Sequence, residues 1–148
     1  AISGDVERAE KLQSSWNKLW DKNGLEPKVY DYGVDSITNP GYDLNPEIIE
    51  SAYYLYKITG DEKYRKMNQK YFADLLEHCK NDVAFHTMEN VITKEPRDNM
   101  PTFFFAETLK YLYLTFSEQD ENFLEEHVFS TEAHPFRKES FRKERIGD

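Results

Sequence analysis

Hydrophobic residues recur at helical spacing in several segments of this chain. The first segment runs from about Asp5 to Lys22, and its apolar side chains form a single stripe of Val6, Ala9, Leu12, Trp16 and Leu19. Gly24 follows at the position where a glycine commonly ends a helix in the left-handed backbone conformation. The pattern predicts an amphipathic helix that buries this stripe.

Helical spacing disappears between Leu25 and Leu44, where prolines and glycines interrupt the chain. We expect a long loop in this segment, with a short strand from Val29 to Tyr32. Long loops are uncommon inside compact domains and are often functional. A second helix is predicted after the loop, because Asn45 and Pro46 are typical of an N-cap residue followed by proline at the first helical position. This helix continues to Ile58.

The third helix is predicted from Glu62 to about Lys80, with Asp61 as its N-cap residue. Because Gly60 lies in a short turn before it, the second and third helices should form an antiparallel hairpin. One face of the third helix carries Tyr64, Met67, Tyr71, Leu75 and Cys79. Cys79, the only cysteine, is therefore expected to be a core residue rather than a nucleophile.

Two elements are predicted in the remaining patterned sequence. The segment from Val83 to Thr93 alternates weakly and indicates a small β-hairpin. The fourth helix, from about Pro101 to Phe116, has almost no polar face. A helix that is apolar all round is buried, yet four helices offer little protein to bury it. We therefore expect this helix to pack against protein outside the chain.

Composition narrows the classes of function. Among 148 residues, 39% are hydrophobic and 32% are charged, as in globular proteins. The formal net charge of −9 argues against nucleic-acid binding and suits a cation or a neutral ligand better. The aromatic share of 15% indicates a large core or a groove for planar or sugar ligands. Motifs of phosphate loops, zinc proteases and serine hydrolases are missing.

Three acidic positions are candidates for chemistry. Glu47 and Glu50 share a face in the first turns of the second helix, where acids also simply stabilise a helix by up to ~1 kcal/mol. Glu107 lies within the apolar fourth helix, where an unpaired carboxylate is costly. It either pairs with Lys110 one turn later or forms, with Phe103, the wall of a sugar pocket.

The segment from Val128 to Phe136 places Thr131, Glu132 and His134 close together. A histidine before proline is usually a turn residue. A threonine, however, offers both a hydroxyl and a carbonyl oxygen, and Ca²⁺ binds oxygen ligands of both kinds. The residues alone leave a turn and a metal site as alternatives.

Together these motifs resemble class I α-1,2-mannosidases, glycoside hydrolase family 47. The string L-N-P-E-I-I-E-S at 44–51, continued by Y-Y-L-Y at 53–56 and T-G-D at 59–61, is similar to the family's LRPE-x-x-ES-x-YYLY and TGD motifs. The strings F-F-F-A-E-T-L-K-Y-L-Y-L at 103–114 and V-F-S-T-E-A-H-P at 128–135 are similar to its later motifs. G-L-E-P at 24–27 also resembles the family's GL-x-PE. The resemblance covers roughly residues 8 to 136.

The resemblance implies an all-α fold, in which this chain supplies the C-terminal third of an (α/α)₇ barrel, with a small β-hairpin. Residues 1–136 would be the C-terminal part of the catalytic barrel, incomplete alone, and residues 137–148 a charged tail. The implied partners are a high-mannose N-glycan and an N-terminal fragment of the same barrel. The implied location is the secretory pathway: the endoplasmic reticulum or Golgi lumen, or outside the cell.

The implied activity is that of a calcium-dependent, inverting exo-α-1,2-mannosidase. Thr131 would bind Ca²⁺, and Glu47 would be the general base acting on a calcium-bound water. Phe103 would stack beneath the mannose. The other acids would contact sugar hydroxyls or calcium-bound waters: Glu107, Glu132 and, as the second acid of its helix, Glu50. His134 would shape the calcium loop, and the general acid would lie upstream of Ala1.

Two departures from the family pattern lie in the substrate region. Asn45 replaces the arginine of Arg-Pro-Glu, which removes a bidentate donor to the glycan, and Pro101-Thr102 replaces a Glu-Ser pair. Two alternatives therefore remain open at this point. One is a mannosidase-like quality-control protein that binds glycans with little or no turnover, and the other is a helical scaffold whose carboxylates only cap and pair.

Overall fold

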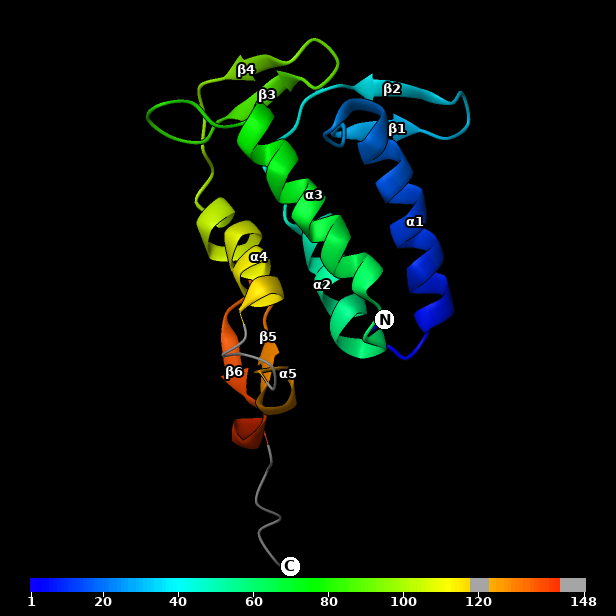
Figure 1. The fold of residues 1–148 in the computed structure, drawn as a ribbon, viewed down its shortest axis with the longest axis vertical. Coiled ribbons are helices and arrows are strands. Elements are labelled where there is room, and N and C mark those ends of the chain that lie inside the picture. Colours follow the sequence, from blue (N-terminus) through cyan, green and yellow to red (C-terminus); the bar gives the residue numbers. More distant parts are fainter. Residues whose placement is uncertain (118–122, 142–148) are drawn as a thin grey trace, which may run out of the picture.

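The computed structural model describes residues 1–117 and 123–141. Helices dominate it, and three two-stranded antiparallel hairpins lie at their ends (Figure 1). The helical elements are α1 (Val6–Asn23), α2 (Glu47–Thr59), α3 (Glu62–His78), a π-helical turn (Phe104–Thr108), α4 (Leu109–Phe116), α5 (Phe123–Glu126) and a 3₁₀ turn (Lys138–Phe141). The strands are β1 (Val29–Asp31), β2 (Ser36–Asn39), β3 (Thr87–Asn90), β4 (Glu95–Arg97), β5 (His127–Phe129) and β6 (Pro135–Arg137).

Helix ends follow the predicted signals, with one exception. Gly24 and Gly60 adopt left-handed φ angles of 67° and 68° after α1 and α2, where a side chain with a Cβ would be strained. Asp61 accepts a hydrogen bond from the Lys63 backbone at the start of α3. At the start of α2, by contrast, Pro46 occupies the N-cap position and no side chain caps the helix. The predicted capping role of Asn45 is therefore wrong.

Helix α2 lies at the centre of the packing, in contact with α1, α3 and α4. Asn68 of α3 connects α2 and α4 through its side-chain amide, which donates to the Ile49 carbonyl at 3.1 Å and to the Thr115 hydroxyl at 2.8 Å. Asn68 is fully buried, so both bonds are shielded from water. Cys79 is also fully buried, which confirms its predicted place in the core.

The predicted stripe of α1 is only partly correct. Leu19 is buried, but Leu12 and Trp16 are 54% and 37% exposed. Gln13 and Trp20 are buried instead, so the buried face is rotated by about one residue. Gln13 can be buried because its side-chain amide donates a hydrogen bond to the Ile48 carbonyl at 3.2 Å. Polar residues can be buried when they are hydrogen-bonded.

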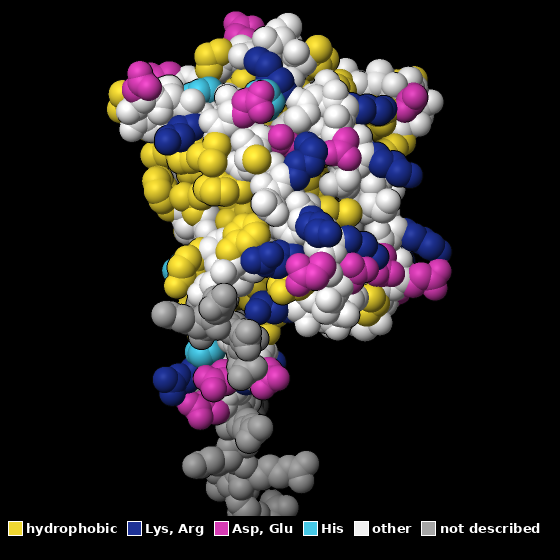
Figure 2. Space-filling model, in the orientation of Figure 1, with side chains coloured by type: hydrophobic (Ala, Val, Ile, Leu, Met, Phe, Trp, Pro, Cys, Tyr) yellow, Lys and Arg dark blue, Asp and Glu magenta, His cyan; other side chains and the backbone are white. Residues whose placement is uncertain are grey.

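The fourth predicted helix differs from the expectation in two ways. It is not α-helical from Pro101, because residues Phe104–Thr108 form a π-helical turn before α4. It is also not buried all round, since Phe105 and Tyr113 are 57% and 60% exposed. Figure 2 shows hydrophobic side chains gathered over the part of the surface where α4 lies. This chain thus leaves one apolar face of the helix uncovered.

The hairpins differ from the expected loops and strands in their extent and pairing. The predicted strand at 29–32 is β1, but it pairs with β2, which the sequence did not suggest. The hairpin expected at 83–93 is shifted to β3 and β4. The segment expected to be a loop near 128–136 forms β5 and β6 around a tight turn. Of the charged tail, Lys138–Phe141 form a 3₁₀ turn, and residues 142–148 lie outside the described part.

No helix within 1–117 or 123–141 is long and apolar enough to cross a membrane.

Candidate active site

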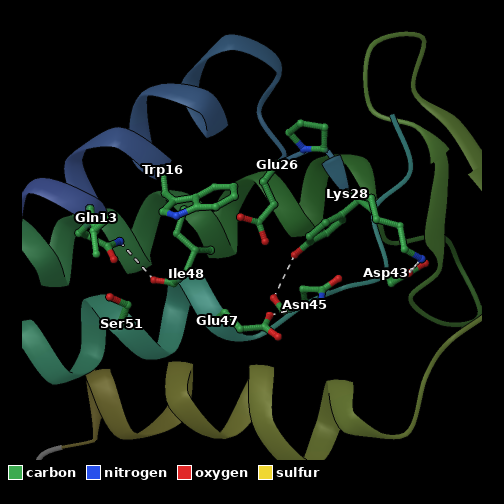
Figure 3. Close-up of a pocket in the computed structure, with 12 residues that line it drawn as sticks. Gln13, Trp16, Glu26, Lys28, Asp43, Asn45, Glu47, Ile48 and Ser51 are labelled. Carbon is green, nitrogen blue, oxygen red and sulfur yellow. Dashed lines mark hydrogen bonds and ion pairs between the residues drawn. The ribbon is translucent and has the colours of Figure 1, made fainter. Parts of the chain in front are cut away.

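A cavity of about 430 Å³ opens beside the first turn of α2 (Figure 3). Its wall combines apolar side chains of α1 with polar and charged groups of the following loop and of α2. It is lined by Leu12, Gln13, Trp16, Glu26, Pro27, Lys28, Tyr42, Asp43, Asn45, Glu47, Ile48 and Ser51. The Trp16 indole and the carboxylates of Glu26 and Glu47 thus line the same cavity.

Glu47 is the first residue of α2, and its side chain is exposed. The loop that delivers it is fixed by Leu44, which is buried and has a positive φ angle of 62°. The Thr108 hydroxyl donates to the Leu44 carbonyl at 2.7 Å, and both groups are buried. The Asn45 amide donates to Glu47 Oε2 at 3.3 Å. The residue that departs from the family pattern thus contacts the predicted general base.

Glu26 is a site residue that the sequence did not single out. It lies in the same cavity wall as Glu47, between the buried residues Leu25 and Pro27. Figure 3 shows its carboxyl group pointing into the cavity. Burial, and then the negative charge of Glu47, raise the pKa of Glu26 to about 8. The only available signal was its place in the G-L-E-P string, because residues in an aperiodic loop carry no burial pattern.

Glu50 lines a second cavity, of about 500 Å³, which it shares with Glu47, Ser51 and Tyr54. Its Oε1 accepts a hydrogen bond from the Tyr111 hydroxyl at 2.8 Å. Burial raises the pKa of Glu50, and the charge of Glu47 adds to the rise, while the bond from Tyr111 opposes it. The first turns of α2 therefore present two carboxylates to adjoining cavities.

Glu107 lies in the π-helical turn and is 9% exposed. The pairing with Lys110 that we considered is not formed, because the Lys110 ammonium group donates to the Ala133 carbonyl at 2.7 Å. Burial is the main cause that raises the pKa of Glu107, followed by the charges of Glu132, Glu47 and Glu50. Carboxylates from α2 and from the β5–β6 turn thus repel the negative charge of Glu107 in the π-helical turn.

Phe103 precedes the π-helical turn and is partly exposed. Its backbone is helical, with φ of −64° and ψ of −19°, so Phe103 and Glu107 follow one another along the same helical segment. A π-helical turn inside an α-helix is frequent at functional sites. The π-helical turn could not be predicted, since the local sequence pattern is that of any apolar helix.

The turn between β5 and β6 holds Thr131 and Glu132 at the surface and buries Ala133, which has a positive φ angle of 54°. The turn is closed by bonds from the Ser130 backbone to the His134 carbonyl, at 2.9 Å, and from the Ala133 backbone to the Ser130 carbonyl, at 3.0 Å. His134 is exposed, and its backbone N–H donates to the Ser130 hydroxyl at 3.1 Å.

Neither oxygen of Thr131 accepts or donates a hydrogen bond within the described residues. Both oxygens are thus available to a hard cation such as Ca²⁺, which takes hydroxyl and carbonyl ligands. The same part of the chain holds no group of three or more His, Cys, Asp or Glu residues that could bind a metal by themselves. The residues therefore fit a cation held by Thr131 together with water, and they do not fit one held by a carboxylate cage.

Comparisons with known proteins show the family of this chain. Residues 2–138 match Glycosyl hydrolase family 47. The chain is 34% identical, over 90% of its length, to the ER degradation-enhancing alpha-mannosidase-like protein 1 of Saccharomyces cerevisiae. It is 36% identical, over 88% of its length, to the mannosyl-oligosaccharide 1,2-alpha-mannosidase IA of Sus scrofa.

A comparison with solved structures supports the same family. The structure matches an alpha-1,2-mannosidase from Trichoderma reesei with a TM-score of 0.74 and 29% sequence identity, over 86% of this chain and 33% of that one. The matched regions make up 19% of the yeast relative and 21% of the porcine one, so the chain spans about a fifth of these relatives. The predicted fold class, mostly helical with small hairpins and similar to the α/α-barrel mannosidases, is confirmed. This chain belongs to glycosyl hydrolase family 47.

Proposed function

We propose that this chain forms the C-terminal part of a calcium-dependent, inverting exo-α-1,2-mannosidase that trims high-mannose N-glycans. The observation that carries the proposal is the convergence of acids from separate segments: Glu47 and Glu50 line one cavity, and the charges of Glu132, Glu47 and Glu50 help raise the pKa of Glu107. Such a site suits a neutral sugar and a hard cation. Relatives named mannosyl-oligosaccharide 1,2-alpha-mannosidase give the substrate class.

Glu47 is the proposed general base. Its carboxylate would accept a proton from the attacking water while the water oxygen bonds to the anomeric carbon. The bond from that carbon to the glycosidic oxygen would break, and an acid outside this chain would protonate the leaving oxygen. Inversion requires the acid and the base to stand about 6.5–9.5 Å apart, so that the water fits between them. The products are β-mannose and a glycan shortened by one residue.

The other residues would bind and orient the sugar. Phe103 would offer its ring to the apolar face of the mannose. Glu107, Glu132 and Glu50 would accept hydrogen bonds from sugar hydroxyls or from ordered water. Thr131 would hold Ca²⁺ through its hydroxyl and carbonyl oxygens, and a bound calcium ion would supply a place to hold and polarise the attacking water.

The proposed partner is the N-terminal part of the same barrel. The chain spans about a fifth of its yeast and porcine relatives, and the family's general acid is expected in the upstream part. Residues 1–136 would thus complete a barrel built from both parts, followed by the charged segment 137–148. The proposed location is the secretory pathway, in line with the endoplasmic reticulum in the name of the yeast relative.

The test is mannose release by the complete barrel, assembled from this chain and the upstream part. With Ca²⁺ present, the assembled protein should release mannose from a glycan ending in α-1,2-linked mannose. Glu47→Gln should lower the rate about 10²- to 10⁴-fold, as expected on losing a general base. EDTA should stop release, and added Ca²⁺ should restore it.

Glu95→Gln is the matched control, because Glu95 is an exposed acid in β4. This variant should keep the full rate. The enzyme proposal fails if the assembled wild-type protein releases no mannose in the presence of Ca²⁺.

A second function is favoured by one specific observation. The yeast relative named as a degradation-enhancing mannosidase-like protein is 34% identical to the chain, and Asn45 and Pro101 depart from the family pattern in the substrate region. The assembled protein would then bind high-mannose glycans in quality control with little or no turnover. Glycan binding that survives Glu47→Gln, without product from the wild type, would select this function.

A further inference from the structure

The structure assigns a positioning role to Tyr111 of α4: we infer that its hydroxyl group holds the Glu50 carboxylate in place within the glycosidase site. The inference rests on the proposed function, because it gives a role to a further residue of the same site. Tyr111 would not touch the sugar. It would act through Glu50.

The geometry of Tyr111 leaves its hydroxyl group little freedom. Tyr111 is 1% exposed, and its ring lies among the rings of Tyr53, Tyr54 and Phe129, at centroid distances of 5.7, 6.1 and 5.6 Å. Its hydroxyl group donates to Glu50 Oε1 at 2.8 Å. A rigid, buried donor of this kind fixes the acceptor, because a hydrogen bond to an ionised group is strong.

Glu50 is placed to use this restraint. It lines the cavity of about 500 Å³ that Glu47 also lines. Its second oxygen, Oε2, has no hydrogen-bond partner in the part of the chain that the structure describes. With Oε1 engaged by Tyr111, Oε2 remains as the acceptor for a sugar hydroxyl or a water beside Glu47.

Several titratable groups around Glu50 influence its ionisation, and the hydrogen bond from Tyr111 is one of these influences. The titratable groups that act on Glu50 are Glu47 and Tyr54 on α2, Tyr111 on α4 and Glu107 in the π-helical turn. Residues 1–3 also line this cavity, and the one charged group that they bring to it is the α-amino group of Ala1, since none of them has a titratable side chain.

Burial and the charge of Glu47 raise the pKa of Glu50, whereas the bond from Tyr111 lowers it. Burial and Glu50 raise the pKa of Tyr111 far above its usual range, so this hydroxyl stays a donor throughout an assay. Tyr111 therefore keeps Glu50 ionised to a lower pH than its surroundings alone would allow.

The test is Tyr111→Phe in the assembled mannosidase, which removes only the hydroxyl group. We expect kcat/KM for a glycan ending in α-1,2-linked mannose to fall about 10- to 100-fold, the factor that matches one hydrogen bond to a charged group. The acid limb of the pH profile should move to higher pH, because Glu50 becomes easier to protonate. A residue with a merely structural role would leave that limb in place.

Tyr64→Phe is the matched control. Tyr64 is also a buried tyrosine, and it donates to a glutamate, Glu10, at 2.7 Å, but outside both cavities. This variant should keep both kcat/KM and the acid limb. The inference is wrong if Tyr111→Phe leaves both quantities unchanged, or if Tyr64→Phe changes them as much.

A second measurement separates this inference from the proposed function. Carbon-13 NMR of labelled glutamate side chains gives the pKa of Glu50 without turnover, and Tyr111→Phe should raise it. If the wild type releases no mannose, the proposed function fails and this titration alone decides the role of Tyr111. An unchanged Glu50 pKa in the variant would overturn it.

Discussion

The carboxylates of the site differ because their surroundings differ. Glu47 begins a helix and is exposed, whereas Glu26 lies between buried neighbours in the wall of the same cavity. Burial favours the neutral form of an acid, and a nearby negative charge adds to that effect. The pKa of Glu26 is accordingly raised to about 8. At neutral pH the cavity thus holds one largely protonated acid, which can donate a hydrogen bond.

The raised pKa of Glu26 predicts how stability depends on pH. Between about pH 4.5 and pH 8, Glu26 is ionised in the unfolded chain but still protonated in the folded one. The folded state therefore binds more protons, and stability should fall as pH rises through this window. Glu26→Gln should flatten that fall, which thermal unfolding midpoints at pH 5 and pH 8 would measure.

Glu7→Gln serves as the control for this prediction. Glu7 is a glutamate of α1 whose side chain is 80% exposed, so its replacement should leave the pH dependence as in the wild type. An equal fall in the midpoint for wild type and Glu26→Gln would contradict the assigned burial of Glu26.

The sequence pointed to some of these candidate residues and not to others. Glu107 was identifiable because an acid in an apolar helix is out of pattern, and Thr131 because of its motif. Glu26 was not, because nothing in an aperiodic loop tells which side chain points inward. Their helical spacing made a pair of Lys110 and Glu107 one of two alternatives, but the Lys110 ammonium group donates to the Ala133 carbonyl instead.

At the scale of elements, side-chain bonds between distant segments position the site. Thr108 connects the π-helical turn to the loop that precedes α2 through its bond to the Leu44 carbonyl. That loop delivers Glu47, and the turn carries Glu107. A buried hydrogen bond, from which water is excluded, thus connects the segments that carry the two acids.

Thr108→Val should test this connection. The change keeps the side-chain shape but leaves the buried Leu44 carbonyl without its donor, which costs about 1–3 kcal/mol in the free energy of unfolding. Urea unfolding of the assembled protein would measure it. Thr102→Val is the control, since Thr102 is exposed, and it should change stability by less than about 0.5 kcal/mol. Equal effects of the two changes would show that the bond contributes nothing.

Helices were predicted more completely than hairpins, for a physical reason. A helix is specified by a local period and by residues such as Gly60 and Asp61 at its ends, and these signals lie within one segment. The hairpins have strands of three or four residues, so short that alternation indicated only one of the described hairpins, and that one a few residues too early. The π-helical turn depends on packing around Glu107 and Thr108, which local sequence does not express.

At the scale of the whole molecule, the uncovered apolar surface is the main feature. Leu12 and Trp16 of α1 are exposed at one place, and Phe105 and Tyr113 of the fourth helical segment at another. Large exposed apolar groups mark surfaces that other protein covers. We expect the rest of the barrel to cover them.

Phe105→Asp should therefore weaken association with the upstream part of the barrel. Burying a phenylalanine contributes about 1.5–3 kcal/mol, so the affinity should fall about 10- to 100-fold or more. Val83→Asp is the control, because Val83 is 93% exposed in a loop after α3. Titration of the upstream fragment with each variant gives the affinities, and equal values for the two variants would contradict a covered α4 face.

We propose that this chain belongs to a barrel that hydrolyses α-1,2-linked mannose with inversion. Proton NMR during the reaction of the assembled, calcium-loaded protein tests it most directly, because one spectrum reports both release and stereochemistry. We expect β-mannose to appear first and to convert to the α anomer only by later mutarotation. Initial release of α-mannose, or no free mannose at all, would contradict it.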